Sequence, residues 1–565
     1  MKEARTLTNR QYVLGFDFGT LSCRVLAVDS DTGDCVYQAS RDYPHGVING
    51  TLPGTDIALE ENWALQDPAD YIDVMCELTR AAIAELGADS IVAIGTDFTN
   101  CTVVGIRENG LPLCAYEEFR GKPHAWAKLW KHHAAQPYAE RIEAVLKETE
   151  TSWLRDYGGN ISSEWFFPKL LEIYEQAPDL FAACDLYLEA ADYIVYFLTG
   201  NIIRNSATLG VNAFYSPERG FPKKSLLNRF SEGFGDAVYP KLKGTVLPVG
   251  SRAGRLREEA AKRLGLSTAV TVSAGHGDSE VACAGLGATE SGTMIMVMGT
   301  STCYQMIYDQ KCLFDGVCAV VEGGMIPELV AYESGQPAVG DAFSWYVENM
   351  MPAEYTRQAS AQGMSALQYM NALAAQLLPG ESGLISLDWF NGNRSVLMDY
   401  SLKSFFAGLS LDTKPEAVFR SMIEATAFGA RKIIEGYENA GLTIKKLIAV
   451  GGLSLKSELT MQIYADVLGS PLCVAMIPNA SAMGACVCGA VAYRHETGTR
   501  AAFEAEVQRL VHGTEMRYEP NQKAVALYNE LYKVFCTLHD FAGLHSNICS
   551  ELNRIQRVSR KAFEK

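Results

Sequence analysis

The sequence predicts an α/β fold made of two duplicated halves. Residues 12–18 alternate from one face to the other as in a β-strand, Gly19 and Thr20 can form a tight turn, and residues 21–28 are typical of a returning strand. The same succession of strand, Gly-Thr turn and strand recurs over residues 293–307. Two copies about half the chain apart indicate one repeated unit, with a nucleotide bound between the halves.

The first hairpin combines a carboxylate with a tight glycine turn. Asp17 falls at the end of the predicted strand, and Thr20 and Ser22 add hydroxyl groups. Small residues let backbone N–H groups approach an anion, and a carboxylate near phosphates usually acts through a bridging cation. We therefore interpret the hairpin as a phosphate and Mg²⁺ site. An ordinary hairpin is the alternative for either copy taken alone.

Residues 90–98 predict a buried strand, and Asn100 follows its carboxyl end. Binding sites in parallel sheets collect beyond the carboxyl ends of strands, so Asn100 is a candidate substrate contact. An asparagine that caps a loop explains the residue equally well.

Residues 120–133 contain two tryptophans, three histidines and several cations. Aromatic rings beside hydrogen-bonding groups suit a sugar, whose C–H faces are apolar and whose hydroxyls are polar. We assign Trp126 to the binding pocket, and for Trp130 core packing is an alternative to a place in that pocket.

The remainder of the first half is predicted to be largely helical. The periodicity predicts helices at 71–86, 138–148, 168–176, 190–198 and 253–264, and a polar loop at 204–212. A short strand at 269–273 then leads to Asp278 and a helix rich in small residues. The positive end of a helix dipole favours an ionised carboxylate, which can accept a proton, although an aspartate here can equally be a helix cap.

A later strand, residues 447–450, delivers Gly451 and Gly452 to the start of a helix near Ser457. Glycine lets the backbone lie against a base or ribose, and a helix N-terminus adds hydrogen-bond donors. The segment does not match the Rossmann or P-loop fingerprints. Residues 481–490, rich in small side chains, predict a tightly packed helix.

Composition bounds the class of protein. The 565 residues are 48% hydrophobic and carry a net charge of −17, which disfavours a nucleic-acid partner. No apolar run has the length of a membrane span, and residues 1–6 lack the apolar segment of a signal peptide. The fifteen cysteines show no zinc or C-x-x-C spacing. We expect a cytoplasmic protein with reduced cysteines and no membrane partner.

Together these features resemble the actin-like, or ribonuclease H-like, ATPases, and within them the FGGY family of carbohydrate kinases. The motifs at 15–24, 97–102, 123–135, 298–303 and 332–341 are similar to those of the ribulokinase branch. The resemblance implies two domains with a cleft between them: residues 1–272, with the sugar site and first phosphate loop, and residues 273–565, with the second phosphate loop and adenosine site.

The resemblance also implies an activity: ATP- and Mg²⁺-dependent phosphorylation of a terminal hydroxyl of a ketopentose, with L-ribulose as the first choice. Asp278 matches the catalytic base and Asp17 the metal ligand. The matched nucleotide positions are Gly19, Thr20, Ser22, Arg24, Gly299, Thr300, Gly451, Gly452 and Ser457, and the matched substrate positions are Asn100, Trp126, Asn212 and Glu333. A homodimer is compatible with the family.

Two positions depart from that branch. Ser279 and Glu280 follow the candidate base where Ala-His is usual, and Asn212 stands where a lysine is expected. The change at Asn212 removes a cation and shortens the reach toward the sugar. Another pentulose or a polyol such as ribitol, and a non-catalytic ATP and sugar sensor, therefore remain as alternatives.

Overall fold

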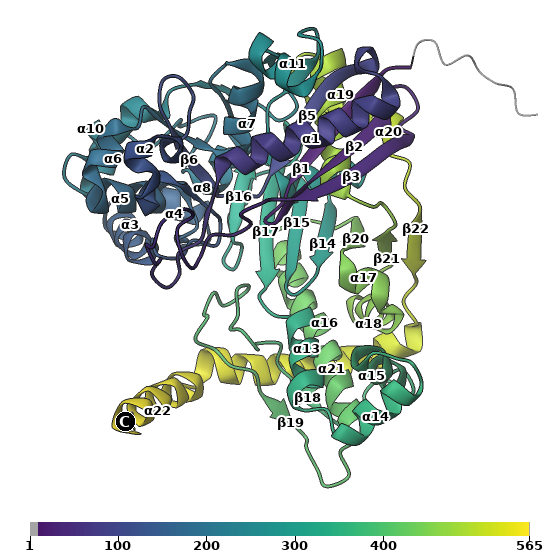
Figure 1. Cartoon of the computed structure of the whole chain (residues 1–565). Helices are drawn as coiled ribbons and strands as arrows, with labels where there is room; N and C mark the ends of the chain where they lie inside the picture. Colours follow the sequence, from purple (N-terminus) through teal and green to yellow (C-terminus); the bar gives the residue numbers. More distant parts are fainter. Residues whose placement is uncertain (1–9, 564–565) are drawn as a thin grey trace, which may run out of the picture.

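The computed structural model describes residues 10–563, and its centre is a pair of seven-stranded sheets (Figure 1). The polar start of the chain at residues 1–6 lies outside the described residues. The first sheet has the order β11-β12-β5-β1-β2-β3, and β13 also pairs with β5. Its strands are β1 (Tyr12–Phe18), β2 (Ser22–Asp29), β3 (Cys35–Asp42), β5 (Ile91–Phe98), β11 (Arg252–Arg255), β12 (Thr271–Ser273) and β13 (His276–Gly277).

The second sheet has the order β16-β17-β15-β14-β20-β21-β22. Its strands are β14 (Thr293–Met298), β15 (Thr302–Tyr308), β16 (Ala319–Glu322), β17 (Val330–Gln336), β20 (Lys446–Val450), β21 (Leu472–Ala475) and β22 (Glu515–Tyr518). In both sheets an antiparallel hairpin, β1–β2 or β14–β15, lies beside a parallel partner, β5 or β20. The next strands, β12 and β21, are again parallel, and β11 and β22 close each sheet in antiparallel direction. The predicted duplication is confirmed for these five strands of each sheet.

Three helices lie between the two sheets: α12 (Asp278–Gly285), α19 (Ala480–Arg494) and α20 (Arg500–Leu510). Their apolar side chains share one core with residues of both sheets, such as Val13 and Ile295. The small residues of α19 follow from close packing, because a Cβ at Gly15 or Gly95 would collide with α19 carbonyls. The helix predicted over residues 481–490 is confirmed.

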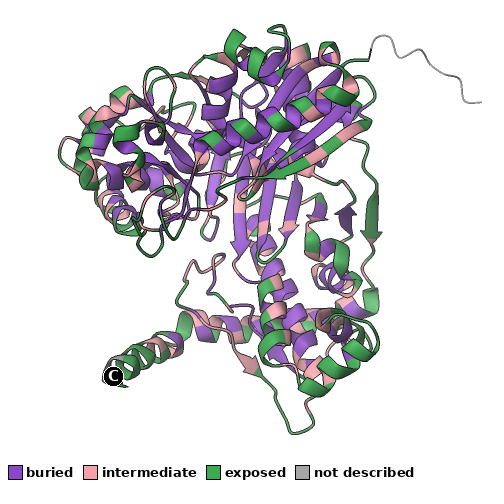
Figure 2. Cartoon of the chain, in the orientation of Figure 1, coloured by how far each residue is buried: buried purple, intermediate pink, exposed green. Residues whose placement is uncertain are grey.

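Helices cover the outer faces of both sheets, and Figure 2 shows the sheets as the most buried part of the chain. The first sheet is covered by α1 (Pro68–Leu86), α7 (Ala190–Thr199) and α11 (Glu258–Leu264). The second is covered by α13 (Gly340–Asn349), α15 (Ala366–Ala374), α16 (Pro415–Asn439), α18 (Glu458–Leu468) and α21 (Gln522–Asp540). A helical lobe with its own core contains α3 (Gln136–Thr149), α5 (Phe166–Gln176), α6 (Pro178–Ala183), α8 (Ser206–Asn212), α9 (Lys224–Phe230) and α10 (Phe234–Val238).

Two predicted elements are wrong. The segment 204–212 is not a loop: β9 (Ile203–Asn205) leads into α8, which Asn205 caps by accepting from the Ala207 amide at 2.7 Å. The predicted helix at 253–264 is divided into β11 and the shorter α11. The four other helices predicted in the first half are present as α1, α3, α5 and α7.

Among the residues that the structure describes, no helix combines the length and the apolar character of a membrane span. The chain ends in α22 (Ile548–Phe563), which projects away from the body of the molecule (Figure 1). The division between residues 272 and 273 stays a prediction; β13, just beyond it, still pairs with β5 of the first sheet.

Candidate active site

A cleft of about 720 Å³ lies where the two halves meet. The first half contributes Thr20, Asn100 and Trp130, and α12 contributes Asp278, Ser279 and Glu280. The second half contributes Cys318, Ala319, Glu333, Arg394, Met398 and Tyr400. The lining is rich in carboxylates, amides and aromatic rings, which suits a small polyhydroxylated molecule.

Asp278 stands at the start of α12, directly after β13. Its Oδ1 accepts a hydrogen bond from the Ser279 amide at 2.8 Å, and its carbonyl accepts one from the Ser481 hydroxyl of α19 at 2.9 Å. Burial, followed by the charges of Glu280 and Asp17, raises the pKa of Asp278 to about 7. A carboxylate with this pKa at a cleft wall can exchange a proton with a bound hydroxyl near neutral pH.

Two further carboxylates lie side by side at the ends of β1 and β5. Asp17 and Asp97 are paired in the parallel register, and both are almost fully buried. Arg24 Nη1 donates to Asp17 Oδ2 at 2.9 Å, whereas neither Asp97 oxygen has a hydrogen-bond partner among the described residues. Burial and then the charge of Asp17 raise the pKa of Asp97 well above its usual value. Such a pair is short of positive charge and offers the hard oxygen ligands that Mg²⁺ prefers.

Asp97 is a candidate that the sequence prediction missed. A signal for it exists, because the strands at 12–18 and 90–98 both end in Asp-Phe, and β1 and β5 pair so that the two motifs coincide.

The first glycine-threonine turn is held from two directions. The Gly19 amide donates to the Ser22 carbonyl at 3.0 Å, which closes the turn. Gln66 Nε2 donates to the Thr20 carbonyl at 2.8 Å, and Trp130 Nε1 donates to the Thr20 hydroxyl at 3.0 Å. The turn is thereby fixed at the edge of the cleft.

The preference predicted between the two tryptophans is reversed in the structure. Trp126 is only 2% exposed, packs in the core of the helical lobe and donates its N–H to the Arg120 carbonyl at 3.0 Å. Trp130 is 36% exposed and lines the cleft. Both residues lie within the same short segment, residues 120–133, and the course of the chain there decides which ring reaches the cavity.

The other predicted substrate residues are divided between the cleft and its surroundings. Asn100 lines the cleft and donates to Glu280 Oε2 at 2.5 Å. Glu333 of β17 also lines it and accepts from Arg394 Nη2 at 2.6 Å. Asn212 ends α8, is fully buried and has both amide atoms unpartnered among the described residues; its neighbour Val211, rather than Asn212, lines the cleft.

The second glycine-threonine turn is anchored through its carbonyls. The amides of Val339 and Asp341 donate to the Thr300 carbonyl at 2.8 and 3.1 Å, and the Gly340 amide donates to the Gly299 carbonyl at 3.1 Å. These donors belong to the start of α13. The turn itself is exposed, and neither of its residues lines the cleft described above.

The predicted adenosine segment abuts the second turn. Gly451 has a φ of 109°, and a Cβ there would collide with the Met298 carbonyl at the end of β14. Gly452 then begins the short helix α17 (Gly452–Lys456). Ser457 is buried, donates to Asn371 Oδ1 at 3.0 Å and caps α18 by accepting from the Thr460 amide at 3.3 Å. Its hydroxyl is therefore engaged within the fold.

Comparison with known proteins decides the family. Residues 12–285 match the N-terminal domain, and residues 294–493 the C-terminal domain, of the FGGY family of carbohydrate kinases. The chain belongs to this family. As an FGGY kinase it is a sugar kinase, for which ATP is the co-substrate.

Relatives and solved structures agree with this assignment. The chain is 39% identical to a ribulokinase of Geobacillus thermodenitrificans, over 98% of this chain and 99% of that one, and 40% identical to a ribulokinase of Mycolicibacterium smegmatis, over 98% of each. A crystal structure of xylulose kinase from Rhodospirillum rubrum superposes with a TM-score of 0.76 at 22% identity, covering 94% of this chain and 98% of the other. Plasmodium falciparum glycerol kinase with ADP superposes with a TM-score of 0.72 at 15% identity, covering 93% and 98%. The structural matches show the shared fold.

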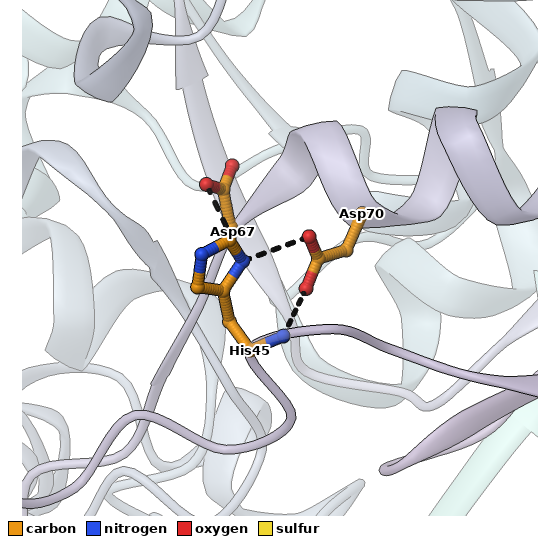
Figure 3. Close-up of side chains that lie close together, drawn as sticks. All are labelled: His45, Asp67 and Asp70. Carbon is orange, nitrogen blue, oxygen red and sulfur yellow. Dashed lines mark hydrogen bonds and ion pairs between the residues drawn. The ribbon is translucent and has the colours of Figure 1, made fainter. Parts of the chain in front are cut away.

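A cluster of possible metal-binding side chains lies outside the cleft, at the start of α1. It consists of His45, Asp67 and Asp70 (Figure 3). His45 Nδ1 lies 2.9 Å from Asp70 Oδ1, and the His45 amide donates to Asp70 Oδ2 at 2.9 Å. Asp67 caps α1 by accepting from the Ala69 amide at 2.9 Å. These bonds fix the helix start next to Gln66, which holds the first turn, and helix capping accounts for the cluster.

Proposed function

We propose that this kinase transfers the γ-phosphoryl group of ATP to a terminal hydroxyl of a ketopentose, with L-ribulose as its principal substrate and L-ribulose 5-phosphate as product. The observation that carries the proposal is Asp278, a carboxylate with a pKa of about 7 at the wall of a polar cleft between the duplicated halves. Full-length relatives at 39–40% identity that are named ribulokinase support the choice of sugar.

In the proposed mechanism, Asp278 accepts the proton of the sugar's terminal hydroxyl as that oxygen attacks the γ-phosphorus. Trp130 provides an apolar surface for the C–H face of the sugar, and Glu333 with its partner Arg394 accepts and donates hydrogen bonds on the opposite wall. Gly19, Thr20, Ser22, Arg24, Gly299 and Thr300 surround the phosphates, and Gly451, Gly452 and Ser457 adjoin the adenosine. Closure of the two halves excludes water, which would otherwise compete for the phosphoryl group.

We assign the magnesium ion of the proposed reaction to Asp17 and extend its site to Asp97. The unpartnered, fully buried carboxylate of Asp97 beside Asp17 fits a hard divalent cation. When bound, the ion supplies charge neutralisation for the phosphates. Arg24, paired with Asp17, holds that carboxylate in a fixed orientation beneath the first turn.

Sugar-dependent ADP formation tests the proposal. The purified chain is assayed with ATP, Mg²⁺ and each of L-ribulose, D-ribulose, D-xylulose, L-xylulose and ribitol, against buffer without sugar, and the product is identified by ³¹P NMR. We expect L-ribulose to give the highest kcat/KM and a 5-phosphate product. A different best sugar would replace the substrate assignment, and ATP binding without turnover on any sugar would favour the sensor alternative.

We further propose that the chain forms a homodimer through α22. Leu552, Ile555 and Val558 are 49%, 53% and 56% exposed on this projecting helix. The helix carries Arg554, Arg557 and Arg560, whereas the whole chain has a net charge of −17, so charge complementarity favours the acidic body of a second copy. Light scattering after size exclusion should give twice the chain mass, and Ile555→Glu should give a monomer. A monomeric wild-type chain would contradict the proposal.

A cytoplasmic location is the last part of the proposal. All fifteen cysteines fall within the described residues and are free thiols, as expected for a reducing compartment. Cell fractionation with compartment markers tests it.

A further inference from the structure

Glu280 is a buried carboxylate in the sugar cleft that the mechanism above does not use. It is only 3% exposed, yet it belongs to the cleft lining together with Asp278, two residues earlier in α12. Asn100 Nδ2 donates to Glu280 Oε2 at 2.5 Å, and the Ser279 hydroxyl donates to the same oxygen at 2.8 Å. A Cβ at Gly277 would collide with both Asn100 Oδ1 and Glu280 Oε2. The absence of a side chain at Gly277 therefore provides the space in which Asn100 and Glu280 meet.

An acidic residue in the first turn of a helix is favoured by the helix dipole alone. That explanation does not require burial, and it does not require two donors from different segments. Burial and the charge of Glu333 raise the pKa of Glu280 to about 7, so the ionised form of this side chain is costly where it lies. A costly polar group that faces a cavity indicates a ligand that interacts with it.

A hydrogen-bond acceptor beside Glu280 is left free. Glu280 uses one N–H of the Asn100 amide and the Ser279 hydroxyl, and the Trp130 N–H is used by Thr20. Asn100 Oδ1 is buried and has no partner among the described residues. A ligand that brings a hydrogen-bond donor would satisfy this buried acceptor, and a sugar hydroxyl can donate whereas a carbonyl oxygen cannot.

We propose that Glu280 and Asn100 determine the specificity of this kinase by accepting a hydrogen bond from the sugar hydroxyl next to the one that Asp278 deprotonates. This inference rests on the proposed function. For a pentulose phosphorylated at C5, the neighbouring hydroxyl is on C4. Glu280 and Asn100 would therefore distinguish sugars by their configuration at C4. A site built to bind one hydroxyl rejects the epimer that leaves its polar groups unpaired.

The test compares L-ribulose with D-xylulose, which differ only in configuration at C4. We expect wild-type kcat/KM to differ between them by about a hundredfold or more, because a site that hydrogen-bonds one hydroxyl discriminates strongly against a sugar that leaves its polar groups unpaired. Glu280→Gln should lower kcat/KM for the preferred sugar by about tenfold or more and leave the other nearly unchanged, because only the preferred epimer uses the lost acceptor. The KM for ATP should not change.

Three controls separate this role from a structural one. Asn100→Ala removes the second member of the pair and should reduce the same sugar ratio. Glu258→Gln removes an acidic residue from the first turn of α11, outside the cleft lining, and should leave the ratio unchanged. Melting temperatures report whether any variant has lost its fold.

An equal fall for both sugars, or a raised KM for ATP, would assign Glu280 a structural role and overturn the inference. A wild-type enzyme that phosphorylates both epimers equally well would overturn it too, while leaving the proposed kinase function intact. Absence of turnover with every sugar of the panel would overturn the proposed function and this inference with it.

Discussion

The two glycine-threonine hairpins occupy equivalent places in their sheets but differ in side chains and in register. Asp17 of β1 pairs with Asp97 of β5, whereas Val297 and Val450 occupy the corresponding pair in β14 and β20. The second turn is also one residue tighter: Phe18 pairs with Cys23, but Met298 pairs with Thr302. The two turns have the same Gly-Thr sequence, but the side chains that follow them therefore do not point to equivalent faces of the two sheets.

This difference shows that duplication has preserved the scaffold and not the chemistry. Beneath the first turn, next to Asp278 and the cleft, lie the carboxylates of Asp17 and Asp97. At the equivalent positions beneath the second turn lie Val297 and Val450. The second turn is instead tied by its carbonyls to the start of α13. The first hairpin is thus suited to binding a cation, and the second to contacts made by its backbone.

The largest expected effect is the loss of the base. Asp278→Asn keeps the size of the side chain but cannot accept the proton, so we expect kcat to fall by about a hundredfold or more. Binding of a fluorescent ATP analogue should be retained, because Asp278 lies on the sugar side of the cleft. Normal turnover by this variant would remove Asp278 from the mechanism.

The carboxylate pair offers the sharpest contrast between the halves. Asp97→Asn should raise the Mg²⁺ concentration for half-maximal activity by about tenfold, as expected when an ionic ligand is removed from a cation site. It should also raise the melting temperature of the ligand-free protein, because a carboxyl group whose ionisation is opposed by burial and by Asp17 is replaced by a neutral amide. Val450→Ala, at the equivalent place, should leave the Mg²⁺ requirement unchanged. An unchanged requirement in Asp97→Asn would restrict the metal site to Asp17.

The pH dependence of activity tests the proposed base, Asp278. Asp278 acts in its ionised form, and its pKa is raised to about 7, so activity should be full above that pH and decline below it. In the acid limb kcat/KM should fall about tenfold for each pH unit. Initial rates between pH 5 and 9 at saturating ATP measure the profile. A midpoint near the ordinary aspartate value would contradict the environment described for Asp278.

Much of this organisation can be predicted from the sequence, because it depends on local pattern. The two hairpins, the glycine-rich strand end before Gly452 and the tightly packed α19 follow from periodicity and small residues. The misassigned segment at 204–212 shows the limit of this approach: its polar residues suggested a loop, but Asn205 caps a buried helix.

The composition of the cleft depends on contacts between distant segments, which local pattern does not report. Asp97 is a candidate metal ligand only because the register of β1 and β5 places it beside Asp17. Glu280 is held in the cleft by a hydrogen bond from Asn100, which lies 180 residues away in the chain. Trp126 and Trp130 likewise owe their places to the contacts that they make, with the Arg120 carbonyl and with the Thr20 hydroxyl.

The tryptophan reversal can be tested with matched variants. Trp130→Phe keeps the ring but loses the hydrogen bond to Thr20, so we expect KM for sugar or ATP to rise severalfold with a small change in stability. Trp126→Phe loses a buried hydrogen bond in the lobe core and should lower the free energy of unfolding by about 1 kcal/mol without altering KM. Kinetics and denaturant unfolding of both variants distinguish the roles. The opposite pattern would restore Trp126 as the pocket residue.

The smallest expected effects concern the turn glycines, and they decide how far the asymmetry between the halves extends. Neither Gly19 nor Gly299 has a positive φ. An added Cβ at Gly299 would lie 3.8 Å from Ser301 O, an ordinary contact, whereas one at Gly19 would lie 3.3 Å from Ser22 O and requires a small shift of the turn. Gly19→Ala and Gly299→Ala should therefore change the free energy of unfolding by less than about 1 kcal/mol. If both turns approach the triphosphate through their amides, each variant should raise the KM for ATP severalfold. An effect at Gly19 alone would mean that the second hairpin supports the fold and does not hold the nucleotide.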